Sequence, residues 1–342
     1  MRKSLLFLFI FHLLPSASLA NPDPDMARLL QFWSSLGGRS LSGLTPQRAR
    51  SVPDLSTAVE VMRRKAQDAN PVQAVAKVYD TTLPGPAGPL EARVYQPAGS
   101  GPFPLLVYFH GGGFVVGSLK SADASARALA NAGGCVVVSV AYRQAPEHPY
   151  PAALKDAYAA FAYVSKSAKE FQGDSRRVAI GGEHSGANLA AAVCLMALDQ
   201  RGRMPIHQLL IGPLTSLDLN SPSYRKNAEA LPYGQADMQW FLKQYLKRPA
   251  DKKSPYVAVL HKASTDLPPA TIIVAELDPL RWDGEAYHQR LLSQGCESVL
   301  RVYPGVTADF FGARAVVGQA RQANEFAGSR LRKAFELRQP SP

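Results

Sequence analysis

The stretch that decides the fold reads Val178-Ala179-Ile180-Gly181-Gly182-Glu183-His184-Ser185-Gly186-Ala187-Asn188-Leu189-Ala190. Its apolar start predicts a buried strand, and its Ala- and Leu-rich end predicts a helix that begins directly after a sharp turn. Small residues on both sides of such a turn are typical of a nucleophile elbow, G-x-S-x-G, which presents a catalytic serine. Gly182 and Gly186 fit the two glycines, but His184 stands at the serine position and Ser185 follows it.

The chain on either side of this stretch alternates between expected strands and expected helices. The other strands are expected at residues 75–83, 90–95, 105–109, 135–140, 207–211, 271–275 and 298–303, and helices at about 121–131, 281–294 and 315–335. A loop rich in Pro and Gly is expected at 84–89, between the first two strands. Alternation of this kind indicates an α/β protein with a mostly parallel central sheet covered by helices on both faces.

Two segments interrupt the alternation. Residues 21–74 carry apolar residues at helical spacing, and residues 214–260 are polar with one clear helix at about 238–246. We expect these two segments to form a helical cap over the C-terminal edge of the sheet. Residues 21–342 are then one domain.

The first twenty residues have the pattern of a secretory signal peptide. Met1-Arg2-Lys3 is basic, residues 5–14 are almost wholly apolar, and small residues stand at Ser18 and Ala20. The apolar run is shorter than the roughly 20 residues that a transmembrane helix needs. We therefore expect an exported protein, periplasmic or secreted, without stable membrane insertion.

Composition argues against several classes of partner. The formal net charge is +11, but the basic residues are dispersed and form no stripe interleaved with aromatic residues, so nucleic acid is not expected. Cys135, Cys194 and Cys296 form no zinc spacing and no disulfide framework. We expect no metal and no cofactor, and the sequence does not predict the oligomeric state or the state of the thiols.

A glycine run follows the expected strand at 105–109. It reads His110-Gly111-Gly112-Gly113-Phe114. Glycines at this point let backbone N–H groups approach a developing negative charge without side chains in the way. Its place before the elbow in chain order favours an oxyanion hole.

Several motifs together resemble those of the hormone-sensitive lipase family of α/β-hydrolases, in its bacterial carboxylesterase branch. The matching stretches are His110–Phe114, Tyr142–Pro151, the elbow, Asp278–Arg281 and Tyr303–Phe311. The resemblance covers almost the whole chain after residue 20 and implies an α/β-hydrolase fold with a helical cap. It implies an oxyanion hole made by the N–H groups of Gly112, Gly113 and Ser185, with His110, Gly111 and Phe114 in the binding loop.

The sequence departs from the family at two catalytic positions. Anchored on the elbow glycines, His184 takes the place of the nucleophilic serine, and Ala308 takes the place of the catalytic histidine. Asp278 matches the acid of the triad. A register with Ser185 as nucleophile would put Glu183 two residues before it, where the tight turn needs a small residue.

These departures lead to one preferred hypothesis and two alternatives. Loss of the serine or the histidine costs a serine hydrolase about a millionfold in turnover, so the preferred hypothesis is a catalytically impaired pseudo-esterase that binds a small ester or carboxylic acid. The first alternative is an active ester hydrolase in which the His184 ring turns into the space beside Ala308 and pairs with Asp278. That pair would activate water or carry the acyl group on the histidine. The second alternative is an interaction protein with a vestigial pocket.

Overall fold

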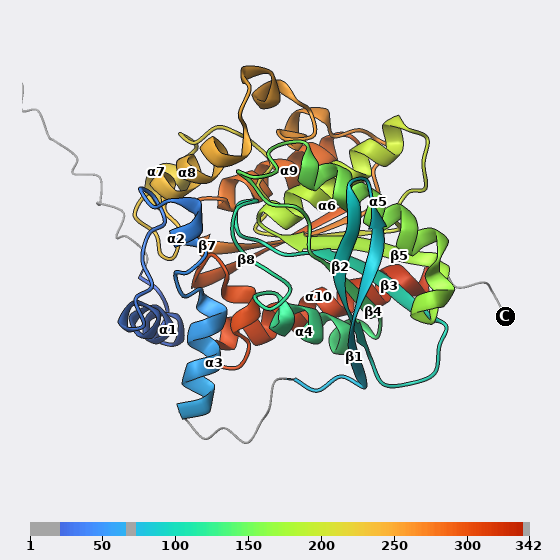
Figure 1. Ribbon diagram of the computed structural model, residues 1–342, viewed down its shortest axis with the longest axis horizontal. Helices are drawn as coiled ribbons and strands as arrows, with labels where there is room; N and C mark the ends of the chain where they lie inside the picture. The colour runs from blue at the N-terminus through green and yellow to red at the C-terminus, as the bar shows by residue number, and fades with distance from the viewer. Residues whose placement is uncertain (1–20, 66–72, 338–342) are drawn as a thin grey trace, which may run out of the picture.

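The computed structural model describes residues 21–65 and 73–337. Its centre is an eight-stranded sheet in the order β1-β2-β4-β3-β5-β6-β7-β8 (Figure 1). The strands are β1 (Lys77–Gly85), β2 (Gly88–Gln96), β3 (Phe103–Phe109), β4 (Val136–Val140), β5 (Gly173–Glu183), β6 (Gln208–Ile211), β7 (Ala270–Leu277) and β8 (Ser298–Thr307). The β1–β2 and β2–β4 pairs are antiparallel and the other pairs are parallel. The predicted α/β-hydrolase fold with a mostly parallel sheet is confirmed.

Helices cover both faces of this sheet. The helices are α1 (Pro24–Ser35), α2 (Pro46–Ala49), α3 (Leu55–Lys65), α4 (Asp123–Gly133), α5 (Ala152–Lys166), α6 (Ser185–Asp199), α7 (Pro222–Lys226), α8 (Gln235–Tyr245), α9 (Arg281–Ser293) and α10 (Gly318–Glu336). Figure 1 shows α5, α6 and α9 on one side of the sheet and α4 and α10 on the other. Side chains of β3 divide between two cores, because Leu105 and Val107 join one apolar cluster while Leu106 and Tyr108 join the other. The continuous apolar run of this strand thus reflects burial on both faces.

The prediction of a loop over residues 84–89 is wrong. Pairing between β1 and β2 continues to Pro84 opposite Pro89 and Gly85 opposite Gly88, so the connection is a tight hairpin. β1 is one of the two edge strands of the sheet. Proline is tolerated in an edge strand because its missing N–H need not serve a neighbour.

The two segments outside the alternation contact one another. Residues 21–65 contribute α1 to α3, and residues 214–260 contribute α7 and α8. The Asp237 carboxylate accepts hydrogen bonds from the Leu41 N–H at 2.6 Å and the Ser42 N–H at 3.0 Å. The Trp240 indole N–H donates to the Leu44 carbonyl at 3.0 Å. These hydrogen bonds hold residues 41–44 against the first half of α8.

Some predictions fall outside this description. The expected signal peptide, residues 1–20, lies outside the described residues.

Among the helices of residues 21–65 and 73–337, none combines the length and the apolar character that crossing a membrane requires. Cys135, Cys194 and Cys296 are all free and buried.

Candidate active site

The turn between β5 and α6 is centred on His184. β5 ends at Glu183, α6 begins at Ser185, and His184 has φ 49° and ψ −108°, an unfavourable conformation for a side chain other than glycine. A Cβ on Gly182 would lie 2.6 Å from the Phe109 carbonyl oxygen, and a Cβ on Gly186 would lie 2.1 Å from the same atom. Only glycine fits at these two positions, so the strained turn presents His184 as an elbow presents its nucleophile.

The His184 ring lies between two carboxylates. Its Nε2 is 3.6 Å from Oδ2 of Asp278, and its Nδ1 is 3.2 Å from Oδ1 of Asp309. The ring thus points toward Asp278, but the separation exceeds the 3.2 Å or so that a working hydrogen bond needs. The contact with Asp309 is shorter, although it is not aligned as a hydrogen bond.

These charges set the protonation of the site. Burial alone would lower the pKa of His184, but the Asp278 carboxylate, followed by Asp309 and Glu183, outweighs burial and raises that pKa from 6.5 to about 9. Burial raises the pKa of Asp309 from 3.8 to about 6, against the opposing effect of the His184 charge. Near neutral pH the His184 ring is therefore protonated, and Asp309 beside it is mostly ionised.

Asp278 is fixed in place. It follows β7, is 2% exposed, and its Oδ1 accepts a hydrogen bond from the Leu280 N–H at 2.8 Å. A Cβ at Gly212, just past β6, would lie 3.0 Å from the His184 ring. The absence of a side chain at this position gives the ring its space beside Asp278.

The loop after β3 has the form of an oxyanion hole. Gly112 and Gly113 have φ 103° and 58°, and a Cβ on Gly112 would lie 2.2 Å from the Val116 carbonyl oxygen. Within the described part of the chain, the N–H groups of these two glycines donate to no acceptor. Ser185 is the first residue of α6, where helix N–H groups have no partner inside the helix. These three groups are therefore free to bind an oxyanion.

Aromatic side chains support this loop from behind. The His110 ring stacks on Tyr142 with centroids 4.4 Å apart, and the Tyr142 hydroxyl donates to the His110 carbonyl at 2.9 Å. Burial lowers the pKa of His110 to about 4, so its ring is neutral and structural. The Ser185 hydroxyl lies 3.4 Å from the Tyr142 hydroxyl. Phe114 stacks on Tyr245 with centroids 3.7 Å apart.

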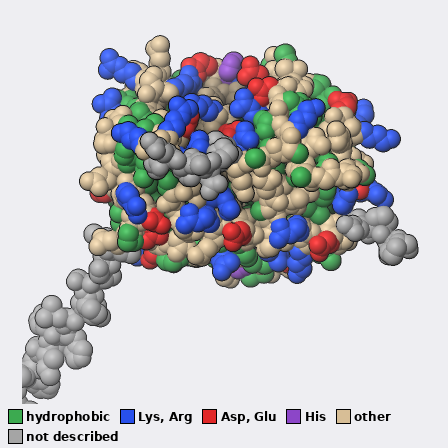
Figure 2. Space-filling model, turned by 90° about the horizontal axis from the view of Figure 1, so that it is seen from below, with side chains coloured by type: hydrophobic (Ala, Val, Ile, Leu, Met, Phe, Trp, Pro, Cys, Tyr) green, Lys and Arg blue, Asp and Glu red, His purple; other side chains and the backbone are tan. Residues whose placement is uncertain are grey.

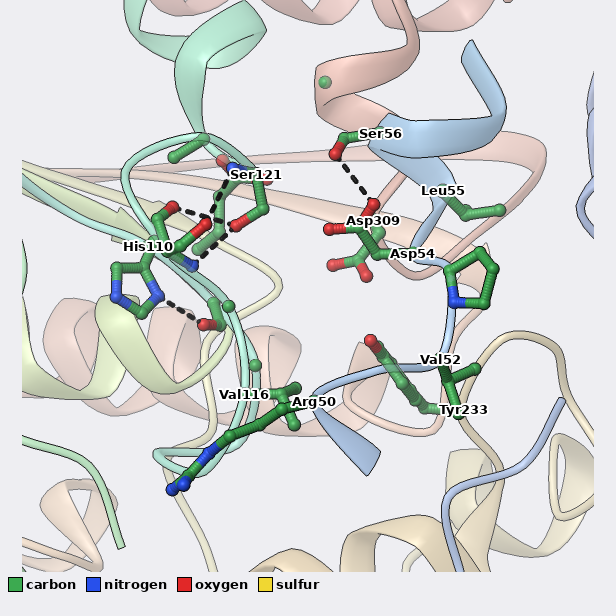
Figure 3. Close-up of a pocket in the computed structure, with 18 of the residues that line it drawn as sticks. Arg50, Val52, Asp54, Leu55, Ser56, His110, Val116, Ser121, Tyr233 and Asp309 are labelled. Carbon is green, nitrogen blue, oxygen red and sulfur yellow. Dashed lines mark hydrogen bonds between the residues drawn. The ribbon is translucent and has the colours of Figure 1, made fainter. Parts of the chain in front are cut away.

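Two unequal cavities meet at the site. The smaller, of about 20 Å³, is lined by His184, Ser185, Gly112, Gly113, Asp278 and Ala308, and by apolar side chains that include Phe114, Met238 and Phe241. The larger, of about 260 Å³, includes Gly111, His110, Glu183 and Asp309 in its wall (Figure 3). Gly112 and Tyr233 line both cavities. The predicted residues His184, Asp278 and Ala308 thus lie together with the glycine loop His110–Phe114, called the oxyanion loop below.

Sequence reasoning did not assign Asp309, Gly212 or Tyr233 to the site. Asp309 belongs to the motif Tyr303–Phe311 and directly follows Ala308. Ala308 could have indicated it, because an alanine in place of the family's histidine leaves room for a neighbouring side chain. No comparable signal in one sequence marks Gly212 or Tyr233. Among the residues that the structure describes, no group of three or more His, Cys, Asp and Glu side chains could hold a metal ion.

The strand order, the elbow and the glycine loop together define an α/β-hydrolase. A family model described as alpha/beta hydrolase fold matches residues 106–312, and the chain belongs to this hormone-sensitive lipase-like family of α/β-hydrolases. The carboxylic ester hydrolase LipN of Mycobacterium tuberculosis is 40% identical over 243 residues, 68% of this chain and 64% of that protein. The esterase LipI of the same organism is 36% identical over 275 residues, 78% of this chain and 85% of that protein.

Solved structures agree with these relatives. An ester hydrolase from the metagenome of Lake Arreo, solved with a bipyridine phosphonate derivative, has a TM-score of 0.82 and 34% identity, and the match covers 92% of this chain and 99% of that one. The preferred hypothesis of a catalytically impaired pseudo-esterase is therefore wrong, since these relatives are named as hydrolases and esterases. The findings favour the alternative that the chain is an active ester hydrolase.

Proposed function

We propose that the chain is an active carboxylic-ester hydrolase whose reaction centre is His184. The observation that carries this proposal is the ring of His184 on a strained turn, paired with buried Asp278 and facing the unused N–H groups of Gly112 and Gly113. Pre-oriented N–H groups of this kind stabilise the charge that develops on an ester oxygen. The similarity to named esterases supports the same function.

The His184–Asp278 pair can activate water directly. When the ring is neutral and its Nε2–H faces Asp278, Nδ1 carries the lone pair. A water that enters between Nδ1 and Asp309, 3.2 Å apart, gives its proton to Nδ1 as the water oxygen attacks the ester carbon. The carbonyl oxygen becomes an oxyanion held by the N–H groups of Gly112, Gly113 and Ser185. The ring then gives the proton to the departing alcohol. Because the pKa of His184 is about 9, this route becomes stronger as the pH rises through that value.

The unequal cavities suggest how an ester would lie. The small apolar cavity beside His184 suits a short acyl group, and the larger cavity has polar walls that suit the alcohol. Residues 21–65 supply Trp33 and Leu41 to these walls, and residues 214–260 supply Tyr233, Met238 and Phe241. This supports the proposed role of the two segments as a cap.

Partners and location are also part of this proposal. Figure 2 shows Lys and Arg side chains interspersed with Asp and Glu on the face in view, which supports a small-molecule partner over nucleic acid. The basic, apolar and small-residue pattern of residues 1–20 supports export through a signal peptide.

The purified chain tests this function with p-nitrophenyl acetate and p-nitrophenyl hexanoate. We expect turnover that follows the protein through successive purification steps, with the acetate preferred. A folded protein that gives no rate above buffer on either ester, at any pH between about 6 and 10, would refute the proposed function.

A further inference from the structure

Asp309 brings a second carboxylate to His184 from the side of the larger cavity. It follows Ala308 and has φ 61° and ψ 10°, a left-handed conformation that is uncommon for residues other than glycine. Its Oδ1 lies 3.2 Å from Nδ1 of His184. Its side chain is 24% exposed, whereas that of Asp278 is 3% exposed. Of the two carboxylates, Asp309 is the one that water in the cavity can reach.

The cavity around Asp309 has room for water and for part of a substrate. Its volume is about 260 Å³, and its wall includes Gly111 and Gly112 of the oxyanion loop. Figure 3 shows Asp309 beside Asp54, with the Tyr233 hydroxyl directed toward the same space. Asp309 and the glycines of the loop therefore border one space that water and an ester can share.

Five charged or titratable groups face Asp309. They are His184 at the turn after β5, Glu183 at the end of β5, Asp278 after β7, Asp54 before α3 and Tyr233 before α8. Burial and the three carboxylates raise the pKa of Asp309 to about 6, while the His184 charge opposes them. Asp309 is therefore ionised at a pH where His184, with a pKa of about 9, still carries its proton.

We propose that Asp309 is the catalytic base for ester hydrolysis near neutral pH, with protonated His184 beside it. This inference rests on the proposed function and changes which group accepts the proton. An Asp309 oxygen takes a proton from water while the water oxygen bonds to the ester carbon, and the carbonyl electron pair moves to the oxygen held by Gly112, Gly113 and Ser185. The bond to the alcohol oxygen then breaks, the alcohol takes the proton from Asp309, and the acid product leaves. The His184 charge stabilises the carboxylate before the proton moves.

The pH dependence of kcat/KM on p-nitrophenyl acetate tests this assignment. The wild-type rate should rise through about pH 6 and again through about pH 9. Asp309→Asn should lose the lower rise and fall about 100-fold at neutral pH, the usual effect of removing a general base. Asp309→Glu should restore part of the neutral-pH rate. Asp266→Asn, an exposed aspartate before β7, is the matched control and should keep the wild-type profile.

A faster Asp309→Asn variant at neutral pH would identify His184 as the base. Removal of the Asp309 charge also lowers the pKa of His184, so if the histidine alone were the base, Asp309→Asn would be faster at neutral pH. An unchanged or higher neutral-pH rate in Asp309→Asn, with normal thermal unfolding, would overturn the proposal while leaving the ester hydrolase intact. No turnover by wild type at any pH would instead refute the proposed function, and this inference with it.

Discussion

The charge on His184 should make the stability of the fold depend on pH in a defined direction. The pKa of this ring is raised from 6.5 to about 9 by the carboxylates around it, after burial is overcome. A raised pKa means that the folded state binds the proton more tightly than the unfolded chain. The stabilisation is fully present below about pH 6.5 and is lost as the pH rises through about 9. The shift corresponds to about 3 kcal/mol, since each pKa unit is worth about 1.4 kcal/mol.

His184→Gln removes this titration while keeping a polar side chain at the turn. Urea unfolding of wild type and variant at about pH 6 and about pH 10 gives the difference in unfolding free energy at each pH. That difference should fall by about 3 kcal/mol between the two conditions, because titrating groups that do not contact His184 cancel in the comparison. A difference that stays constant within about 0.5 kcal/mol would mean that folding does not raise the pKa of His184, and the ion-pair description of the site would be wrong.

Three further substitutions test separate parts of the site. Gly186→Ala places a Cβ 2.1 Å from a backbone oxygen and should cost about 3 kcal/mol or more in urea unfolding; wild-type stability would contradict the elbow register. Phe241→Ala opens the small apolar cavity and should raise the ratio of kcat/KM for p-nitrophenyl hexanoate over acetate about tenfold; an unchanged ratio would show that the acyl group binds elsewhere. Tyr142→Phe removes the hydroxyl bond to the oxyanion loop and should cost about 1 kcal/mol in thermal unfolding and lower kcat. Tyr163→Phe is its control, because this partly buried tyrosine bonds Glu170 through its hydroxyl and lies outside the site. Equal kcat in both variants would refute the supporting role.

Much of the fold could be predicted from the sequence because local patterns and burial agree. The apolar runs at 105–109 and 135–140 form strands buried on both faces, which needs no information from distant residues. The elbow glycines were recognisable because close approach of strand and helix excludes a Cβ at both positions. The hairpin at 84–89 was missed because prolines usually mark loops. Pro84 is accommodated in the edge strand β1, and Pro89 stands at the start of β2, before its pairing with β4 begins at Ala92.

The electrostatics of the site could not be predicted in the same way. The contact of His184 with Asp309 depends on a left-handed residue and on segments more than a hundred residues apart. The size of the cavities depends on side chains from α8 and from the segment before α3. His184 and Ala308, at the family positions of the catalytic serine and histidine, therefore suggested an inactive site. The structure instead shows His184 between two carboxylates and beside an oxyanion loop with unused N–H groups.

The most direct test of the central claim compares kcat/KM of wild type and His184→Ala on p-nitrophenyl acetate at about pH 9, where the pKa of the ring allows it to act. Circular dichroism should first confirm that both proteins are folded. Loss of an acid–base group from an active site reduces rates about 10²–10⁴-fold, and we expect the alanine variant to fall within that range. A variant that keeps the wild-type rate would show that ester hydrolysis by this chain does not depend on His184.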